Sequence, residues 1–282
     1  MVRAPVLLRA DGPLLSGRRG LVRPLGGLLE RGPAGIPLEA AGGSPWAGAV
    51  VAPPALPRGV LVKVLGIDEA GRGAVLGPLV VAGILAPESK LMRLRELGAR
   101  DSKAVPRESR KGRLVAIARE FQVRAVVIPA QAVDRESLTE LELAAAAHLI
   151  RRALFESPAA GTRHLPRVSV VVDAPVHPRA IPGFLAELSR RTALPPGAIS
   201  AYPKADALHP AVGAASLAAK VIRDAYVAFL RTRYGDFGWG YPGEKRVQAF
   251  LSDWLARTGG FPPICRTRWR SVRALLEGKL PL

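Results

Sequence analysis

The chain has 282 residues, enough for one large domain or two small ones, and 49% of them are hydrophobic, so most of it is expected to fold. Its 41 lysines and arginines against 23 acidic residues give a net charge of +18, which favours a polyanionic partner, although a GC-rich genome also raises the arginine content. A single cysteine, Cys265, excludes a disulfide framework and a thiolate zinc site, and no apolar run reaches the roughly 18 residues of a membrane span.

The first 59 residues differ in composition from the rest. They are rich in Gly, Pro, Ala and Leu, and turn dipeptides such as Gly12-Pro13 and Pro53-Pro54 interrupt them. We interpret residues 1–59 as a poorly ordered extension; a small accessory domain and a start codon placed too early are the alternatives. Charged residues break the N-terminal apolar stretches, so we expect no secretory signal and a cytoplasmic location.

From Val60 onward, predicted strands alternate with predicted helices. Apolar, β-branched runs predict strands at residues 60–67, 79–85, 123–128, 168–172 and 199–202. Helical spacing predicts helices at residues 106–120, 138–155, 179–191, 212–233 and 244–257, followed by a basic C-terminal helix. This alternation is typical of an α/β domain spanning residues 60–282.

Acidic residues stand at the ends of three predicted strands. Asp68 and Glu69 follow the first strand, Asp173 follows residues 168–172, and Asp206 comes soon after the short strand 199–202. The carboxyl ends of strands are where sites assemble in open α/β sheets, so these acids could converge. Clustered carboxylates repel one another, and a pair of hard divalent cations would remove the repulsion and activate water at a phosphodiester. Each acid taken alone is more simply a loop residue or a helix cap.

A glycine-rich turn, Gly71-Arg72-Gly73, lies next to the first two acids. Together with Gly77 it has the spacing GxGxxxG and leads into a strand, which speaks against a dinucleotide-binding loop. Backbone without a Cβ can approach sugar or phosphate closely, so the turn could contact a nucleic acid. An ordinary hairpin turn is the competing interpretation.

The longest predicted helix carries a polar face. Ser216, Lys220 and Asp224 lie one turn apart, and Asp224 either adds a fifth acid or pairs with Lys220 or caps a neighbouring segment. The four histidines show no ligand spacing. Near the C-terminus we expect Trp269 to pack and some of the surrounding arginines to contact phosphate.

Seven short motifs occur in an order typical of one known family. They are Gly66-Ile67-Asp68-Glu69-Ala70-Gly71-Arg72-Gly73, Asp101-Ser102-Lys103, Val172-Asp173-Ala174, Lys204-Ala205-Asp206, residues 214–221 with Arg223-Asp224, residues 234–242, and Phe261-Pro262-Pro263-Ile264. The chain thereby resembles the type 2 ribonucleases H, or ribonuclease HII, over about residues 62–275. The last two motifs are closer to the archaeal and eukaryotic branch than to the bacterial one.

The resemblance implies a ribonuclease H-like fold, with a central mixed β-sheet flanked by helices and a C-terminal helical part. It implies a centre for two Mg²⁺ or Mn²⁺ ions held by four acids, namely Asp68, Glu69, Asp173 and Asp206. It also implies that Gly71, Arg72 and Gly73 read the ribose 2′-OH and that Tyr241 stacks on the sugar of the adjoining deoxynucleotide. The polar positions that it places near the substrate backbone are Ser102, Lys103, Lys204, Ser216 and Lys220.

The expected function is therefore endonucleolytic hydrolysis of the RNA strand in RNA/DNA hybrids. The resemblance adds cutting on the 5′ side of ribonucleotides embedded in duplex DNA, with 3′-OH and 5′-phosphate ends, by a monomer that needs no membrane. The rivals are a non-catalytic hybrid-binding protein, a ribonuclease HIII with an N-terminal platform, and a dinucleotide-dependent enzyme. Departures from the family occur at Ala74, Ala104, Pro203, Gly213 and Arg268, and none removes an acid, the glycine turn or the tyrosine.

Overall fold

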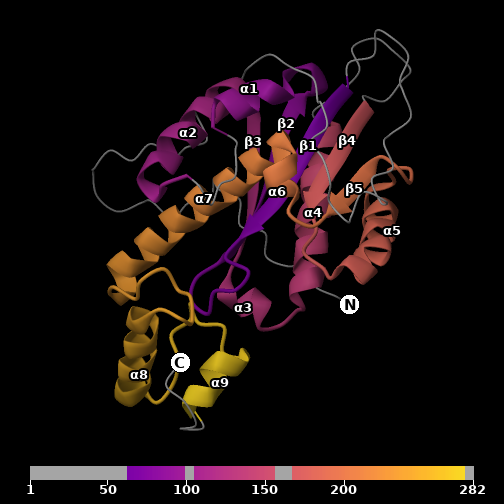
Figure 1. Cartoon of the computed structure of the whole chain (residues 1–282). Coiled ribbons are helices and arrows are strands. Elements are labelled where there is room, and N and C mark those ends of the chain that lie inside the picture. The colour runs from indigo at the N-terminus through magenta and orange to yellow at the C-terminus, as the bar shows by residue number, and fades with distance from the viewer. Residues whose placement is uncertain (1–61, 99–104, 156–166, 277–282) are drawn as a thin grey trace.

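Five strands form one mixed sheet in the order β3-β2-β1-β4-β5 (Figure 1). The computed structural model describes residues 62–98, 105–155 and 167–276. The strands are β1 (Val62–Ala70), β2 (Leu79–Pro87), β3 (Gln122–Ile128), β4 (Arg167–Asp173) and β5 (Ile199–Tyr202). β1 and β3 run antiparallel to β2, whereas β4 runs parallel to both β1 and β5. The mixed sheet confirms the predicted fold class.

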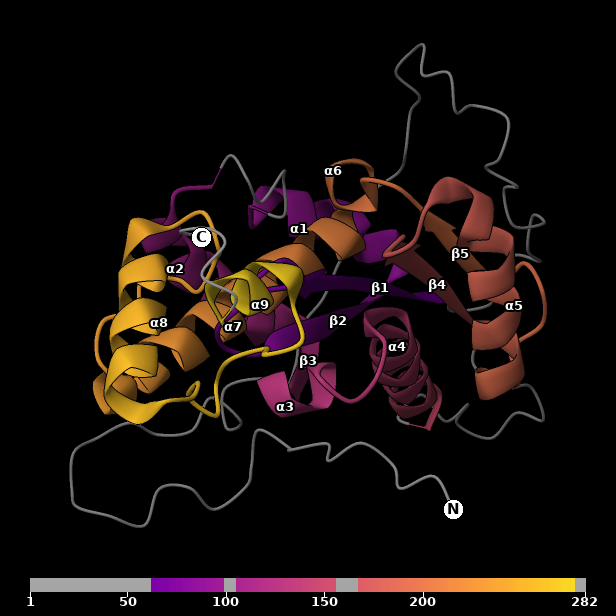
Figure 2. The same ribbon diagram turned by 90° about the horizontal axis from the view of Figure 1, so that it is seen from below.

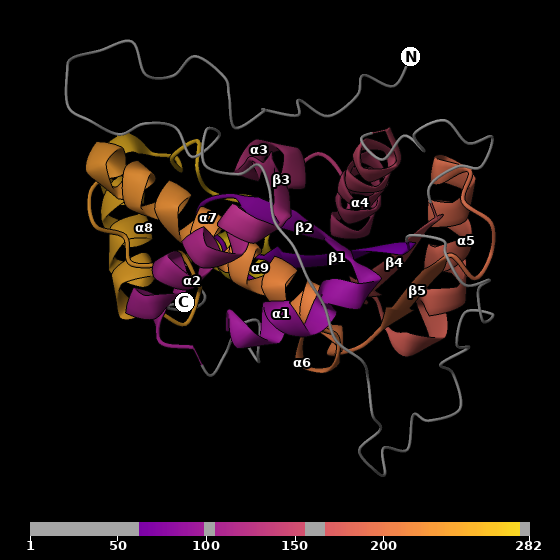
Figure 3. The ribbon, with the colours of Figure 1, turned by 90° about the horizontal axis from the view of Figure 1, so that it is seen from above.

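Helices cover both faces of this sheet. They are α1 (Leu91–Glu96), α2 (Arg107–Glu120), α3 (Ala130–Val133), α4 (Leu138–Phe155), α5 (Ile181–Thr192), α6 (Ala205–Leu208), α7 (Pro210–Tyr234), α8 (Lys245–Thr258) and α9 (Arg270–Leu276), with short 3-10 turns at Glu88–Lys90 and Pro178–Ala180. Figures 2 and 3 show α1, α2 and α7 on one face and α4 and α5 on the other. Successive residues of β1 point to opposite faces of the sheet, each of which has its own apolar core. Val64 packs in the core under α7, and Leu65 packs in the core under α4.

The long helix α7 packs directly onto β1 at Gly66. A Cβ at that position would collide with the backbone of Ala211 and Val212, so only glycine allows this close approach. The contact lies two residues before Asp68 in β1. It therefore sets the α7 residues that follow Val212 beside the acidic end of the strand.

The C-terminal part forms a third apolar cluster at the far end of α7, together with α8 and α9 (Figure 1). Its buried members are Val75, Leu76, Val227, Phe237, Val247, Leu251, Ile264, Cys265 and Val272. Two of them belong to the loop between β1 and β2, and a single β-bridge joins Leu76 to Cys265. The C-terminal helices thus pack against the loop that carries the glycine-rich turn.

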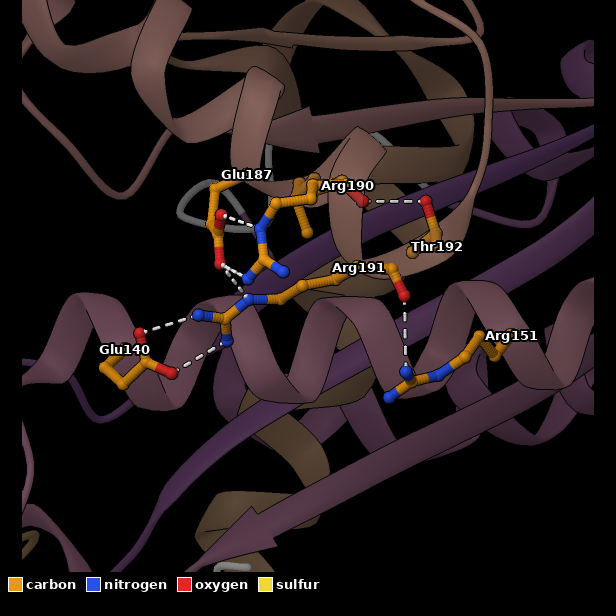
Figure 4. A network of polar contacts seen from close by, with 7 residues as sticks. Glu140, Arg151, Glu187, Arg190, Arg191 and Thr192 are labelled. Carbon is orange, nitrogen blue, oxygen red and sulfur yellow. Dashed lines mark hydrogen bonds and ion pairs between the residues drawn. The ribbon is translucent and has the colours of Figure 1, made fainter. Parts of the chain in front are cut away.

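An ion-pair network joins α4 to α5 on the other face (Figure 4). Arg191 donates from Nη1 and Nη2 to the two carboxylate oxygens of Glu140, at 2.8 and 2.9 Å. Its Nε also donates to Glu187 at 2.6 Å. This two-pronged contact ties the first turn of α4 to the last turn of α5.

The predicted strands and long helices are confirmed, with their bounds shifted by a few residues. The helices α1, α3 and α6 were not predicted, because four to six residues carry too little periodicity to show. The predicted extension, residues 1–59, lies outside the described residues. Within the described ranges, no helix combines the length and the apolar character needed to cross a bilayer.

Candidate active site

Asp68 lies within β1, not after it as predicted, because pairing with β2 continues to Ala70. Its side chain is 5% exposed. Burial raises the pKa of Asp68 to about 6; the hydrogen bond from Ser216 opposes the rise, Asp173 adds to it, and Lys220 opposes it. The carboxylate thus lies between a second acid and two donors from α7.

Glu69 and Asp173 complete a group of three neighbouring carboxylates. β4 lies parallel to β1 with Val172 opposite Ile67, so Asp173 comes next to Asp68 at the same end of the sheet. The pKa of Glu69 is raised well above its usual range, first by burial and then by the charges of Asp68, Glu142 and Asp173. The negative charges of Asp68, Glu69 and Asp173 therefore act on one another.

Asp206 lies in the first turn of α6 and is 4% exposed. The preceding residue, Ala205, donates its backbone N–H to Oδ1 of Asp173 at 2.7 Å. This bond fixes the start of α6 against the end of β4. The hydrogen bond of Ala205 thereby holds the neighbouring Asp206 close to Asp173. Lys204, which precedes Ala205, is exposed and adopts a left-handed backbone with φ of 60°.

In the described part of the chain, no three or more acidic, histidine or cysteine side chains are arranged as a ready-made metal cage. The donor set nevertheless suits a hard cation. Mg²⁺ uses one or two carboxylates together with water and substrate phosphate oxygens, so it does not need a cage made of protein alone. The raised pKa values of Asp68 and Glu69 also show carboxylates whose repulsion a cation would relieve.

The glycine-rich turn follows β1 directly. Gly71 has φ of 88°, and a Cβ there would collide with the side chain of Arg223 and come within 2.6 Å of the carbonyl of Pro78. Gly73 is exposed, with nothing within 4 Å of the place where its Cβ would lie. Between them, Arg72 directs Nε inward to Oε1 of Glu142 at 2.8 Å. The turn is fixed on its inner side and open on its outer side.

The loop that carries Tyr241 is hydrogen-bonded to the same segment. The carbonyl of Gly240 accepts from the N–H groups of Val75 and Leu76, at 2.8 and 3.1 Å. The carboxylate of Glu244 accepts from the backbone N–H of Tyr241 at 3.0 Å, and this bond joins the two ends of the Tyr241–Glu244 turn. The Tyr241 side chain is 38% exposed, and the guanidinium of Arg223 lies 4.8 Å from the centre of its ring. One face of the ring is therefore supported, and part of the side chain remains accessible.

The polar face of α7 divides between two tasks. Ser216 is fully buried and its hydroxyl hydrogen-bonds Asp68, so it is placed to orient that carboxylate. Nζ of Lys220 donates to that hydroxyl at 2.6 Å. The structure gives Asp224 a different partner from the predicted Lys220, since its Oδ2 accepts from Nε of Arg107 at 2.9 Å. Ser102 and Lys103 lie outside the described residues.

Two buried charges were missed by sequence reasoning. Glu142 stands in the apolar run of α4, where an acid among leucines and alanines was the available signal. Arg266 belongs to the basic segment expected to contact phosphate, but it is fully buried and donates to the carbonyls of Arg72 and Gly71. Trp269 packs against the cores, as predicted.

Comparisons with known proteins identify the family of this chain. The family model Ribonuclease HII matches residues 65–272. Ribonuclease HII of Pyrococcus furiosus is 35% identical over 77% of this chain and 92% of its own length, and that of Thermofilum pendens is 36% identical over 76% and 99%.

Solved structures show the same likeness. The ribonuclease H2 of Pyrococcus horikoshii is 32% identical with a TM-score of 0.64, covering 77% of this chain and 98% of its own. A ribonuclease HII from Archaeoglobus fulgidus, solved in complex with PCNA, gives 32% and 0.63, covering 74% and 94%. Bst-RNase HIII in complex with Mn²⁺, at 21% identity and a TM-score of 0.61 over 78% of this chain and 71% of its own, shares the fold. The chain belongs to the ribonuclease HII family.

Proposed function

We propose that this chain is an endonuclease, dependent on divalent metal, that cleaves the RNA strand of RNA/DNA hybrids and cuts 5′ of ribonucleotides embedded in duplex DNA. Family membership supports the coarser part, a ribonuclease H acting on hybrids. The observation that carries the proposal is the juxtaposition of three carboxylates, Asp68, Glu69 and Asp173, with a glycine turn open on its outer side.

The carboxylates are the groups that would hold Mg²⁺ or Mn²⁺. Asp68 and Asp173 would ligate the ions most directly, and Glu69 and Asp206 would complete the two sites. When bound, two such ions activate water and stabilise the oxygen that leaves phosphorus. Ser216 and Lys220 keep Asp68 ionised by hydrogen bonding and charge. Water adds to phosphorus as the bond to the 3′ oxygen breaks, so the products carry a 3′-OH and a 5′-phosphate.

The acids alone do not choose which phosphodiester is cut. That choice requires groups that sense the sugar, and Gly71 to Gly73 offer bare backbone for the 2′-OH. The accessible part of Tyr241 would stack on the neighbouring deoxyribose, which lacks that hydroxyl. Exposed Lys204 and partly buried Lys220 are the described cations near the acids that would meet the phosphate backbone. Ser102 and Lys103 would extend the same contact.

An enzyme with this substrate class would remove RNA primers and single ribonucleotides during DNA replication and repair. A monomer acting in the cytoplasm suffices for this task, because all the proposed groups come from one chain. The high net positive charge of +18 supports binding of a nucleic-acid duplex.

A cleavage assay on matched duplexes tests the proposal. One duplex carries a single ribonucleotide, a second carries a full RNA strand, and a third is all DNA, each incubated with Mg²⁺, Mn²⁺ or a chelator. We expect cuts 5′ of the single ribonucleotide and along the RNA strand, none in DNA, and none with the chelator. Cleavage that survives chelation, or equal cleavage of all three duplexes, would overturn the proposal.

A further inference from the structure

A buried ionic cluster lies on the inner side of the Gly71–Gly73 turn. Glu142 of α4 is 3% exposed, and its Oε1 accepts from Nε of Arg72 at 2.8 Å. The buried Arg266 donates from Nη1 to the carbonyl of Arg72 at 2.9 Å and from Nη2 to that of Gly71 at 2.8 Å. The turn is thus held through a side chain and through its main chain at the same time.

Packing alone does not explain this cluster. Burial raises the pKa of Glu142 to about 7, against the opposing charges of Arg72 and Arg266, so the ionised acid is costly to keep in this position. Replacing a buried ion pair by apolar side chains of similar volume is often neutral or stabilising. The other buried positions of α4 are leucine, isoleucine and alanine. What the carboxylate adds to this face is a fixed position for Arg72.

The main-chain contacts set the direction of the turn's amides. The described peptide bonds include none in cis, and in a trans peptide group the C=O and the N–H point in opposite directions. Because the carbonyls of Gly71 and Arg72 face Arg266, the N–H groups of Arg72 and Gly73 face the exposed side. Two consecutive N–H groups are a pair of donors for one oxygen atom.

We infer that Glu142 is a positioning residue for ribonucleotide recognition: it anchors Arg72 from α4, while Arg266 holds the adjoining carbonyls, so that the amides of Arg72 and Gly73 stay aimed at the sugar oxygen. The inference rests on the proposed reading of the 2′-OH by this turn. It assigns to α4, which carries no metal ligand, a part in choosing the substrate. Loosening the anchor should cost preference for a ribonucleotide more than affinity for duplex in general.

The test measures binding without cleavage, in an Asp173→Asn background. The probes are two duplexes that differ at one position, a ribonucleotide or the matching deoxynucleotide, and the readout is the ratio of their Kd values. We expect Glu142→Met, which keeps volume and helix propensity, to lower this preference about 10-fold, the usual scale of a lost charge-assisted hydrogen bond. Glu142→Gln retains an oxygen for Arg72 and should lose less.

Glu140→Met is the matched control, because it breaks the α4 ion pair with Arg191 shown in Figure 4 without reaching the turn, and the preference should stay unchanged. If Glu142→Met does not fold, Arg72→Met removes the same ion pair from its partly exposed end. A full preference retained by a folded Glu142→Met, or by Arg72→Met in its place, overturns the inference. Absence of preference in the background protein itself would instead refute the proposed reading of the 2′-OH.

Discussion

Nζ of Lys220 lies 2.6 Å from Oγ of Ser216, and the same hydroxyl hydrogen-bonds Asp68. A cation, a hydroxyl and a carboxylate therefore form one chain from α7 to β1. The chain lowers the proton affinity of Asp68, which burial otherwise raises. Ser216 and Lys220 therefore favour the ionised form of Asp68, the form that the proposed metal binding requires.

Ser216→Ala should weaken metal binding most strongly at mildly acidic pH. Loss of the hydroxyl removes a donor to the ionised form, so the pKa of Asp68 rises above about 6 and protons compete better with the metal. We expect Mn²⁺ affinity, measured calorimetrically, to fall about 10-fold at pH 6 and less at pH 8. Ser200→Ala, which removes a hydroxyl bonded to a carbonyl of β4, should leave both values near wild type.

Asp173→Asn should lower the cleavage rate by about 10³-fold or more while hybrid binding persists, since a lost ligand removes several kcal/mol of transition-state stabilisation. Asparagine can still accept from the N–H of Ala205, so the junction of β4 and α6 should survive. Single-turnover rates and hybrid affinity are the measurements. Asp224→Asn, which weakens the ion pairs with Arg107 and with the more distant Arg110 and Arg223, should be milder, and near-normal turnover by the Asp173 variant would refute the assignment of Asp173.

Tyr241→Ala should lose much more activity on a single embedded ribonucleotide than on a long hybrid. A single ribonucleotide offers one junction with deoxyribose, whereas a long RNA strand offers many equivalent bonds. Tyr241→Phe should keep most of the activity, because stacking does not need the hydroxyl. Cleavage rates on both substrates and the melting temperature are the measurements. Equal losses on both, together with a lower melting temperature, would show that the ring only packs its loop.

Removal of residues 1–58 should leave folding and cleavage largely intact. The reason is compositional, since the Gly- and Pro-rich segment lacks periodicity and the first strand begins after it. Thermal unfolding and cleavage rates of the shortened chain are the measurements. A large fall in melting temperature would show packing against the domain, and a loss of hybrid affinity alone would identify a basic arm.

The free energy of unfolding, measured between pH 4.5 and 7.5, should show the contribution of His209 to stability. Its Nδ1 accepts from the N–H of Ala211 at the start of α7, and burial, with the nearby charge of Arg95, lowers its pKa to about 4. Between this pKa and the usual value of 6.5, His209 is protonated in the unfolded chain and neutral in the folded chain. The free energy of unfolding therefore falls as the pH drops from 6.5 toward 4. We expect a contribution of about 2–3 kcal/mol to be lost over that range. His209→Asn, which retains a cap, should lack this component; identical pH profiles would contradict the assignment.

Local pattern was enough to predict the strands and the long helices, whereas the role of the acids at the strand ends stays a prediction. The strand runs are apolar and β-branched, and helices such as α4 and α7 are long enough for their periodicity to show. What failed were features set by distant partners. β1 continues through Asp68 and Glu69 because β2 pairs with it there, which the first strand alone does not reveal.

Sequence reasoning missed Glu142 and Arg266, the residues that hold the Gly71–Gly73 turn, for the same physical reason. Glu142 acquires its role from Arg72, which lies 70 positions earlier in the chain, and nothing near Glu142 signals the pairing. A basic segment looks the same whether its arginines contact phosphate or a buried carbonyl, so the sequence did not single out Arg266 as the buried one. Burial decides between the two, and burial here depends on how the C-terminal loop folds back.

The bond from Arg266 to the carbonyl of Gly71 spans 195 residues of sequence. On the ribosome, the strand with the acids emerges well before the residue that holds the adjoining turn. A nascent chain, or one whose synthesis stops before residue 266, lacks this hydrogen bond and the contribution of Val272 to the third apolar cluster. The order of synthesis thus delays the bonds that hold the turn until long after the acids of β1 have been made.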